Sequence, residues 1–90
     1  MVEKKSIEKT EHKAFSSLSK AVRNRRNELK LTQKELANYA GCGVVFIYDL
    51  ELGKPSIRLD KLVEVLIILG LELRLQLGKA GLEIAPELEK

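Results

Sequence analysis

The side chains of this chain that are best suited to chemistry would bind phosphate rather than break bonds. Thr32, Gln33 and Lys34 stand together at the start of an expected helix. Free backbone N–H groups beside an amide and an ammonium suit an anion at such a place. The sequence lacks the spacing of a nucleophile with its base. It also lacks the spacing of a glycine-rich phosphate loop and that of a metal site. We therefore expect a binding protein that is not an enzyme and uses no cofactor or metal.

The basic residues of this 90-residue chain are concentrated near its N-terminal end. Residues 1–30 hold nine Lys or Arg and four Glu, whereas the whole chain has a net charge of +3. This asymmetry suits a polyanion such as nucleic acid, although solvated helix faces are often basic as well. With 44% hydrophobic and 32% charged residues, the chain is expected to form one small globular domain.

Cysteine content and hydropathy limit which classes of protein remain possible. The single cysteine, Cys42, cannot form an internal disulfide, and His12 is the only histidine. No stretch reaches the roughly 18 apolar residues needed to span a bilayer, and residues 1–30 hold no apolar run suited to secretion. We expect a reduced, cytoplasmic protein without a membrane partner.

Four helices are expected to position the phosphate-binding groups. An apolar stripe predicts a first helix over residues 17–29, after a flexible arm at 1–15. A capping box of Thr32 and Glu35 begins a second helix, which Gly41 ends. Gly43 precedes a third helix over 44–51, and a fourth runs over 59–69 to Gly70. A mobile tail is expected at 78–90.

The domain is expected to cover residues 16–70. A strand that forms a dimer is expected directly after it. The strict alternation over 71–77 places four leucines on one face, namely Leu71, Leu73, Leu75 and Leu77. A lone edge strand leaves its backbone groups unpaired, so pairing with a second copy is predicted. The helix over 59–69 is apolar nearly all round, and Val63 and Ile67 are expected in the same dimer interface.

The spacing of the second and third helices predicts a helix-turn-helix. Ala37 is small where one helix crosses the other, and Gly41 supplies the turn. Leu36, Cys42, Ile47 and Leu50 are expected to fix both helices to the core, with Cys42 a small buried hydrophobe. Arg26 is expected to be structural, paired with Glu35 or Glu51.

The sequence resembles the Cro/C1-type (XRE) helix-turn-helix repressors over roughly residues 17–70. The matching residues are Val22, Arg23, Arg26, Leu31, Thr32, Gln33, Leu36, Ala37, Gly41, Ile47, Leu50, Glu51, Gly53 and Lys54. Residues 46–55 and 58–71 are also similar to the HipB-type antitoxins. The resemblance implies an all-α, lambda-repressor-like domain that binds a palindromic operator as a homodimer. It also implies a HipA-type kinase toxin as a partner.

The resemblance places Gln33 at the family's phosphate-contacting glutamine, although it could instead be a solvated first-turn residue. The other expected DNA contacts are Thr32, Lys34, Gly43, Val44, Val45, Tyr48, Lys54 and Arg23. Such repressors usually carry polar or basic side chains where this chain has Gly43, Val44 and Val45. The two valines could contact thymine methyl groups. Alternatively, they could belong to the core.

The function that the resemblance implies is a sequence-specific transcriptional repressor that is the antitoxin of a HipA-type kinase toxin and autoregulates its operon. Two other functions remain open. The chain could be a stand-alone repressor without a toxin, or a protein-interaction module that kept the fold and lost DNA affinity. In the antitoxin interpretation the tail would add contacts by ordering on binding, through Leu82, Ile84 and Leu88.

Overall fold

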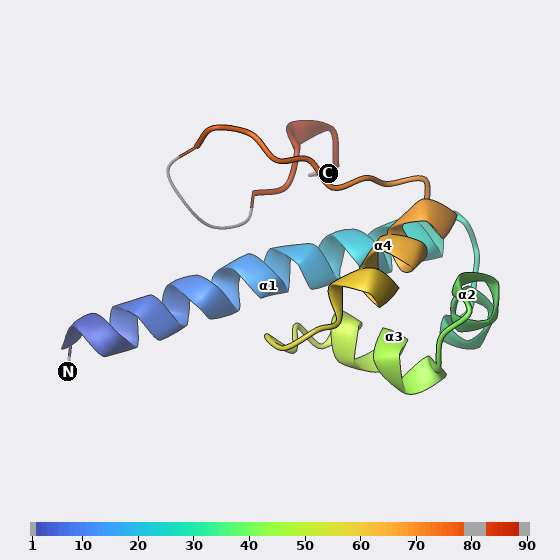
Figure 1. The fold of residues 1–90 in the computed structure, drawn as a ribbon, viewed down its shortest axis with the longest axis horizontal. Coiled ribbons are helices and arrows are strands. Elements are labelled where there is room, and N and C mark those ends of the chain that lie inside the picture. The colour runs from blue at the N-terminus through green and yellow to red at the C-terminus, as the bar shows by residue number, and fades with distance from the viewer. Residues whose placement is uncertain (1, 79–82, 89–90) are drawn as a thin grey trace.

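The computed structural model describes residues 2–78 and 83–88, and side chains from residue 15 onward. Its elements are α1 (Val2–Glu28), α2 (Gln33–Ala40), α3 (Val44–Glu51), α4 (Leu59–Ile68) and a short 3-10 helix, η1 (Pro86–Leu88). The described part is thus all-α, and the four predicted helices are confirmed (Figure 1). The bounds of α2 and α3 agree with the prediction, and α4 ends one residue earlier.

Helix α1 is longer than the sequence pattern predicted. It ends near the expected residue but begins at Val2 rather than near residue 17, so the predicted start is wrong. Residues 2–14 have no apolar stripe but are rich in Glu and Lys, whose helix propensity is high. Helix propensity therefore favours continuing the helix through residues that carry no apolar stripe. In Figure 1 this half of α1 extends away from the other helices; the flexible arm stays a prediction.

All four α-helices end in the same backbone arrangement, a Schellman motif. At the end of α2, the N–H of Gly41 donates to Asn38 O and that of Cys42 to Ala37 O. This bend requires a left-handed residue, and Gly41 has φ of 70° as predicted. At the end of α1 the same place is held by Lys30, with φ of 58°. The turns between helices are therefore short and tightly defined.

The core lies where the four helices meet. Its fully buried large side chains come from all of them: Val22, Leu36, Ile47, Leu50, Val65 and Leu69. The predicted burial of Ile47 is confirmed, whereas Cys42 is only partly buried because it lies in the turn after α2, at the edge of the core. Burial nevertheless raises the pKa of the Cys42 thiol above its ordinary value.

Three arginines in one stretch of α1 hold the ends of other helices. Arg25 Nε donates to the carbonyl of Leu69, at 2.8 Å, beside the end of α4. Arg23 and Arg26 both reach Glu51 at the end of α3. Cations near a helix C-terminus satisfy its last carbonyls and interact favourably with its dipole. The C-terminal part of α1 is thereby fixed against both α3 and α4.

Residues 71–77 do not form the predicted strand, and the described residues contain none. The N–H of Leu71 donates to Leu66 O at 2.8 Å and closes the end of α4. Beyond it residues 72–78 adopt no regular secondary structure, and a strand forms only where its backbone is paired in a ladder. Leu73, Leu75 and Leu77 are exposed. In Figure 1 this segment lies on the side of α1 away from α3.

Candidate nucleic-acid interface

The start of α2 has free backbone N–H groups that suit an anion. The Thr32 hydroxyl accepts from Glu35 N at 3.0 Å, and a Glu35 carboxylate oxygen accepts from Thr32 N at 2.8 Å, so the predicted capping box is confirmed. The backbone N–H groups of Gln33 and Lys34 have no partner among the described residues. They therefore remain available to an acceptor from outside the chain.

A turn of three residues, 41–43, carries the chain from α2 into α3. The Lys61 ammonium of α4 donates to Gly41 O at 3.3 Å and links the turn to that helix. Gly43 caps α3 with φ of −79° and ψ of 152°, and no side chain covers the start of that helix. The first turn of α3 is thus uncovered.

Helix α3 buries one face and exposes another. Ile47, Leu50 and Glu51 face the interior. Val44, Val45 and Tyr48 are 44%, 67% and 54% exposed, respectively. The alternative that the two valines belong to the core is therefore wrong. The exposed face of α3 is apolar in its first turn and carries a phenol one turn later.

A buried carboxylate connects α3 to α1 and α2. Glu51 accepts a bidentate ion pair from Arg26, at 2.7 Å from Nε and 2.9 Å from Nη2. Arg26 is therefore paired with Glu51 and not Glu35, and this bond raises the pKa of the guanidinium. Gln33 Nε2 donates to the same carboxylate at 3.2 Å. The amide is held at the start of α2 with its second N–H still free to donate.

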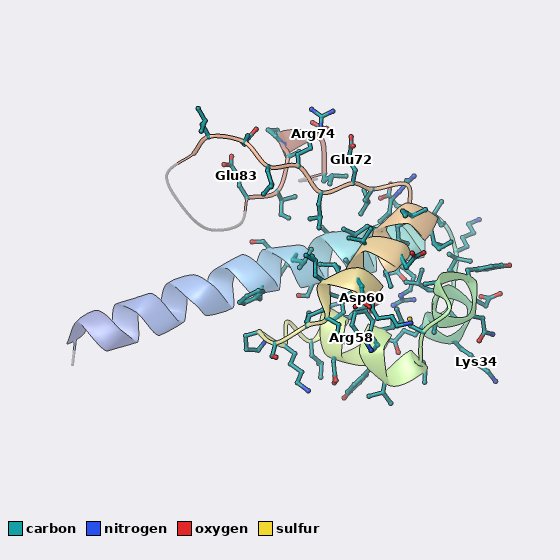
Figure 2. The ribbon with its side chains drawn as sticks, viewed as in Figure 1. Lys34, Arg58, Asp60, Glu72, Arg74 and Glu83 are labelled. Atoms are coloured by element: carbon teal, nitrogen blue, oxygen red, sulfur yellow. The ribbon has the colours of Figure 1, made fainter. Side chains whose placement is uncertain are left out.

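The expected phosphate-binding cations differ in how far they are engaged. Arg23 donates to the backbone carbonyl of Glu51 at 2.7 Å, with its side chain 47% exposed. The ammonium nitrogen of Lys54 lies 3.4 Å from a carboxylate oxygen of Asp49. Lys34 is exposed, forms no ion pair with a described residue, and points away from the body of the protein in Figure 2. Lys34 is thus the cation of this group with the least internal pairing.

Sequence reasoning missed Asp49. It lies four residues after Val45 and therefore on the same side of α3. Its carboxylate would repel DNA phosphates, but the nearby Lys54 offsets its charge. The i, i+4 spacing from Val45 was the signal that could have identified it. The sequence predicted Glu51 only as one of two possible partners for Arg26, and not its central role.

The residues expected at a dimer interface are mostly exposed. Val63 and Ile67 lie one turn apart on α4 and are 38% and 60% exposed. Leu75 and Leu77 are fully exposed, whereas Leu71 packs partly against the core. Figure 2 places Glu72, Arg74 and Glu83 well apart from Lys34, across α1. The C-terminal segment is therefore remote from the start of α2.

The described residues offer neither a metal site nor a membrane span. They contain no group of three or more His, Cys, Asp or Glu placed to hold a metal ion. No helix among them is long and apolar enough to cross a membrane.

The geometry defines a class of protein: a helix-turn-helix domain whose second helix is exposed at its first turn. Comparisons with known proteins agree. A Helix-turn-helix family model (HTH_3) matches residues 22–76. The chain is 45% identical over 58 residues to an uncharacterized HTH-type transcriptional regulator, y4mF, of Sinorhizobium fredii (strain NBRC 101917 / NGR234). That match covers 64% of this chain and 76% of the relative.

A solved structure supports the same fold. The crystal structure of the clp gene regulator ClgR from Corynebacterium glutamicum is similar, with a TM-score of 0.59 and 25% identity. The match covers 66% of this chain and 63% of that one, so less than two thirds of ClgR is represented. This chain belongs to the Cro/C1-type helix-turn-helix family of DNA-binding transcriptional regulators. The family is not enzymatic, and its lambda-repressor-like fold is the one described above.

Proposed function

We propose that this regulator represses transcription in the cytoplasm by binding a palindromic operator as a two-fold homodimer. The observation that carries the proposal is the exposed first turn of α3, in a chain whose preceding helix leaves the N–H groups of Gln33 and Lys34 free. In this proposal α3 enters the major groove, and the start of α2 contacts the phosphate backbone. Thr32, Arg23 and Lys54 would supply further backbone contacts. Gly43, without a side chain, allows a close approach.

A second copy of this chain would cover the apolar residues at the C-terminal end of the domain. Val63 and Ile67 on α4 and Leu73, Leu75 and Leu77 of the 71–77 segment are exposed in the single chain. Pairing two such segments would satisfy their backbone groups and form the strand that one chain alone lacks. A two-fold dimer would place two α3 helices about 34–36 Å apart, one turn of DNA.

The finer assignment we propose is the antitoxin of a HipA-type kinase toxin, which would autoregulate its own operon. It rests on the resemblance of residues 46–55 and 58–71 to HipB-type antitoxins. The C-terminal segment lies across α1 from α3, so a bound operator would leave it accessible to a protein. Ile84 and Leu88 are partly buried against the protein, and Leu82 lies outside the described residues. Co-purification with the neighbouring gene product, followed by a kinase assay, tests this role.

Two alternatives predict different results. A stand-alone repressor would bind its operator and retain no kinase. A protein-interaction module would bind DNA weakly and without sequence preference, and the scarcity of polar side chains in the first turn of α3 favours it. Selection of duplexes from a random pool separates the two, because only a repressor enriches a palindrome.

The recognition surface is tested by adding a negative charge to it. Val45→Asp should abolish operator binding, measured by fluorescence anisotropy, because an anion would lie in the groove. Ala85→Asp adds the same charge in the exposed segment across α1 from α3 and should leave binding unchanged. Equal binding by Val45→Asp and the unsubstituted chain would show that DNA is bound by another surface.

A further inference from the structure

The exposed half of α3 has an unusual chemical character. Val44 and Val45 are the first two residues of the helix, both exposed, and neither side chain can donate or accept a hydrogen bond. Gly43, which precedes them, has no side chain at all. The polar side chains nearest to this turn on the same helix are Tyr48 and Asp49. The start of α3 therefore cannot read a base pair by side-chain hydrogen bonds.

Neither folding nor helix formation explains these valines. The core contacts of α3 are made by Ile47 and Leu50, which are fully buried. Valine forms helices less readily than alanine or leucine, because its branched side chain loses freedom against the preceding turn. Two exposed valines in succession thus favour neither packing nor the helix. This points to contact with something outside the chain.

The major groove of DNA offers one apolar group to such a surface. Each base pair presents donors and acceptors there, but only thymine among the four bases adds a methyl group, at C5. Groups at the start of α2 also suit DNA: the free N–H groups of Gln33 and Lys34 and the Lys34 ammonium complement phosphates. The occupant of this apolar face is therefore a duplex, and the matching feature within the groove is a C5-methyl group.

We propose that Val44 and Val45 give this regulator its sequence preference by burying pyrimidine C5-methyl groups in the major groove. This inference rests on the proposed binding of α3 in that groove. The valines contact the methyl group and not the hydrogen-bonding edge of the base. The regulator therefore distinguishes thymine from uracil, and it accepts 5-methylcytosine in place of thymine where cytosine is rejected.

The test uses the full chain and duplexes enriched from a random pool. The enriched duplex is resynthesised with deoxyuridine at one thymine at a time, which removes only the methyl group. Binding should weaken roughly fourfold at each contacted position, the amount expected for one buried methyl group. At such a position, 5-methylcytosine paired with guanine should bind more tightly than cytosine paired with guanine.

Two variants connect the effect to the valines. Val45→Ala should reduce the difference in binding between thymine and uracil duplexes at the position that Val45 contacts. Leu59→Ala truncates a side chain of similar exposure on α4 and should keep the discrimination. If duplexes bind but removal of no methyl group weakens binding, the methyl inference is overturned and the proposed operator binding stands. If no duplex is enriched, both the inference and the proposed function fall.

Discussion

Arg26 of α1 and Glu51 of α3 form a bidentate ion pair in which Glu51 is only 4% exposed. The same carboxylate accepts from the amide of Gln33, at the start of α2. One buried anion thus connects three helices, including the two that form the proposed DNA-binding surface. Its partners satisfy it fully, since every buried side-chain polar atom in the described part of the chain has a hydrogen-bond partner.

Glu51→Ala should destabilise the domain by about 3–5 kcal/mol, because it leaves the Arg26 guanidinium without its anion. The free energy of unfolding in urea measures the loss. The matched control is Asp60→Ala, which breaks the exposed Arg58–Asp60 pair and should change stability little. Similar unfolding midpoints for the two variants would contradict a structural role for the buried pair.

Lys34→Ala should weaken operator binding and lower its salt dependence. In the proposed complex each Lys34 neutralises one phosphate, so the slope of log affinity against log salt should fall by about 1 per protomer. Gln33→Ala should weaken binding to all duplexes similarly but change the slope little, since the amide is uncharged. A salt slope unaltered by Lys34→Ala would remove that lysine from the phosphate contacts.

Leu75→Glu should convert the proposed dimer to a monomer, because it places a charge on the apolar face of the 71–77 segment. Equilibrium sedimentation at micromolar concentration measures the change. Gln76→Glu introduces the same side chain on the opposite face and should leave the dimer intact. A monomeric unsubstituted chain would refute the dimer itself.

The stability contributed by the Cys42 thiol should depend on pH only in the alkaline range. Burial raises its pKa in the folded state above the ordinary value of 9.0. A group whose pKa is raised on folding stabilises the protein fully below its unfolded pKa and loses this effect as pH rises through the folded value. The difference in unfolding free energy between the unsubstituted chain and Cys42→Ala should therefore be constant to about pH 8. Above pH 9 the unsubstituted chain should lose stability relative to Cys42→Ala. A difference in unfolding free energy that is constant across this range would contradict the raised pKa.

The sequence predicted those parts of the fold that local patterns determine. The capping box at Thr32, the glycine turn at Gly41 and the apolar spacing of α2 and α3 depend on residues within a few positions of one another, and each is confirmed. The start of α1 could not be predicted from an apolar stripe, because residues 2–14 carry no such stripe. The 71–77 strand failed for a different reason, since pairing depends on a second backbone that a single chain does not provide.

The candidate site was predictable in position but not in its internal contacts. The helix-turn-helix spacing located Gln33, Val44 and Val45. The hydrogen bond between Gln33 and Glu51 joins residues 18 positions apart, and no local pattern encodes it. The exposure of the valines likewise depends on how α3 packs, which leaves their side open.

The apolar turn of α3 and the leucines of residues 71–77 lie on opposite sides of α1. Under the proposed function, one surface chooses the operator and the other chooses the partner subunit. Substitutions at Val44 or Val45 would then alter which promoters are controlled without altering self-association. Duplicated copies of such a gene could diverge in target while still forming mixed dimers, until changes in the leucine segment separated them.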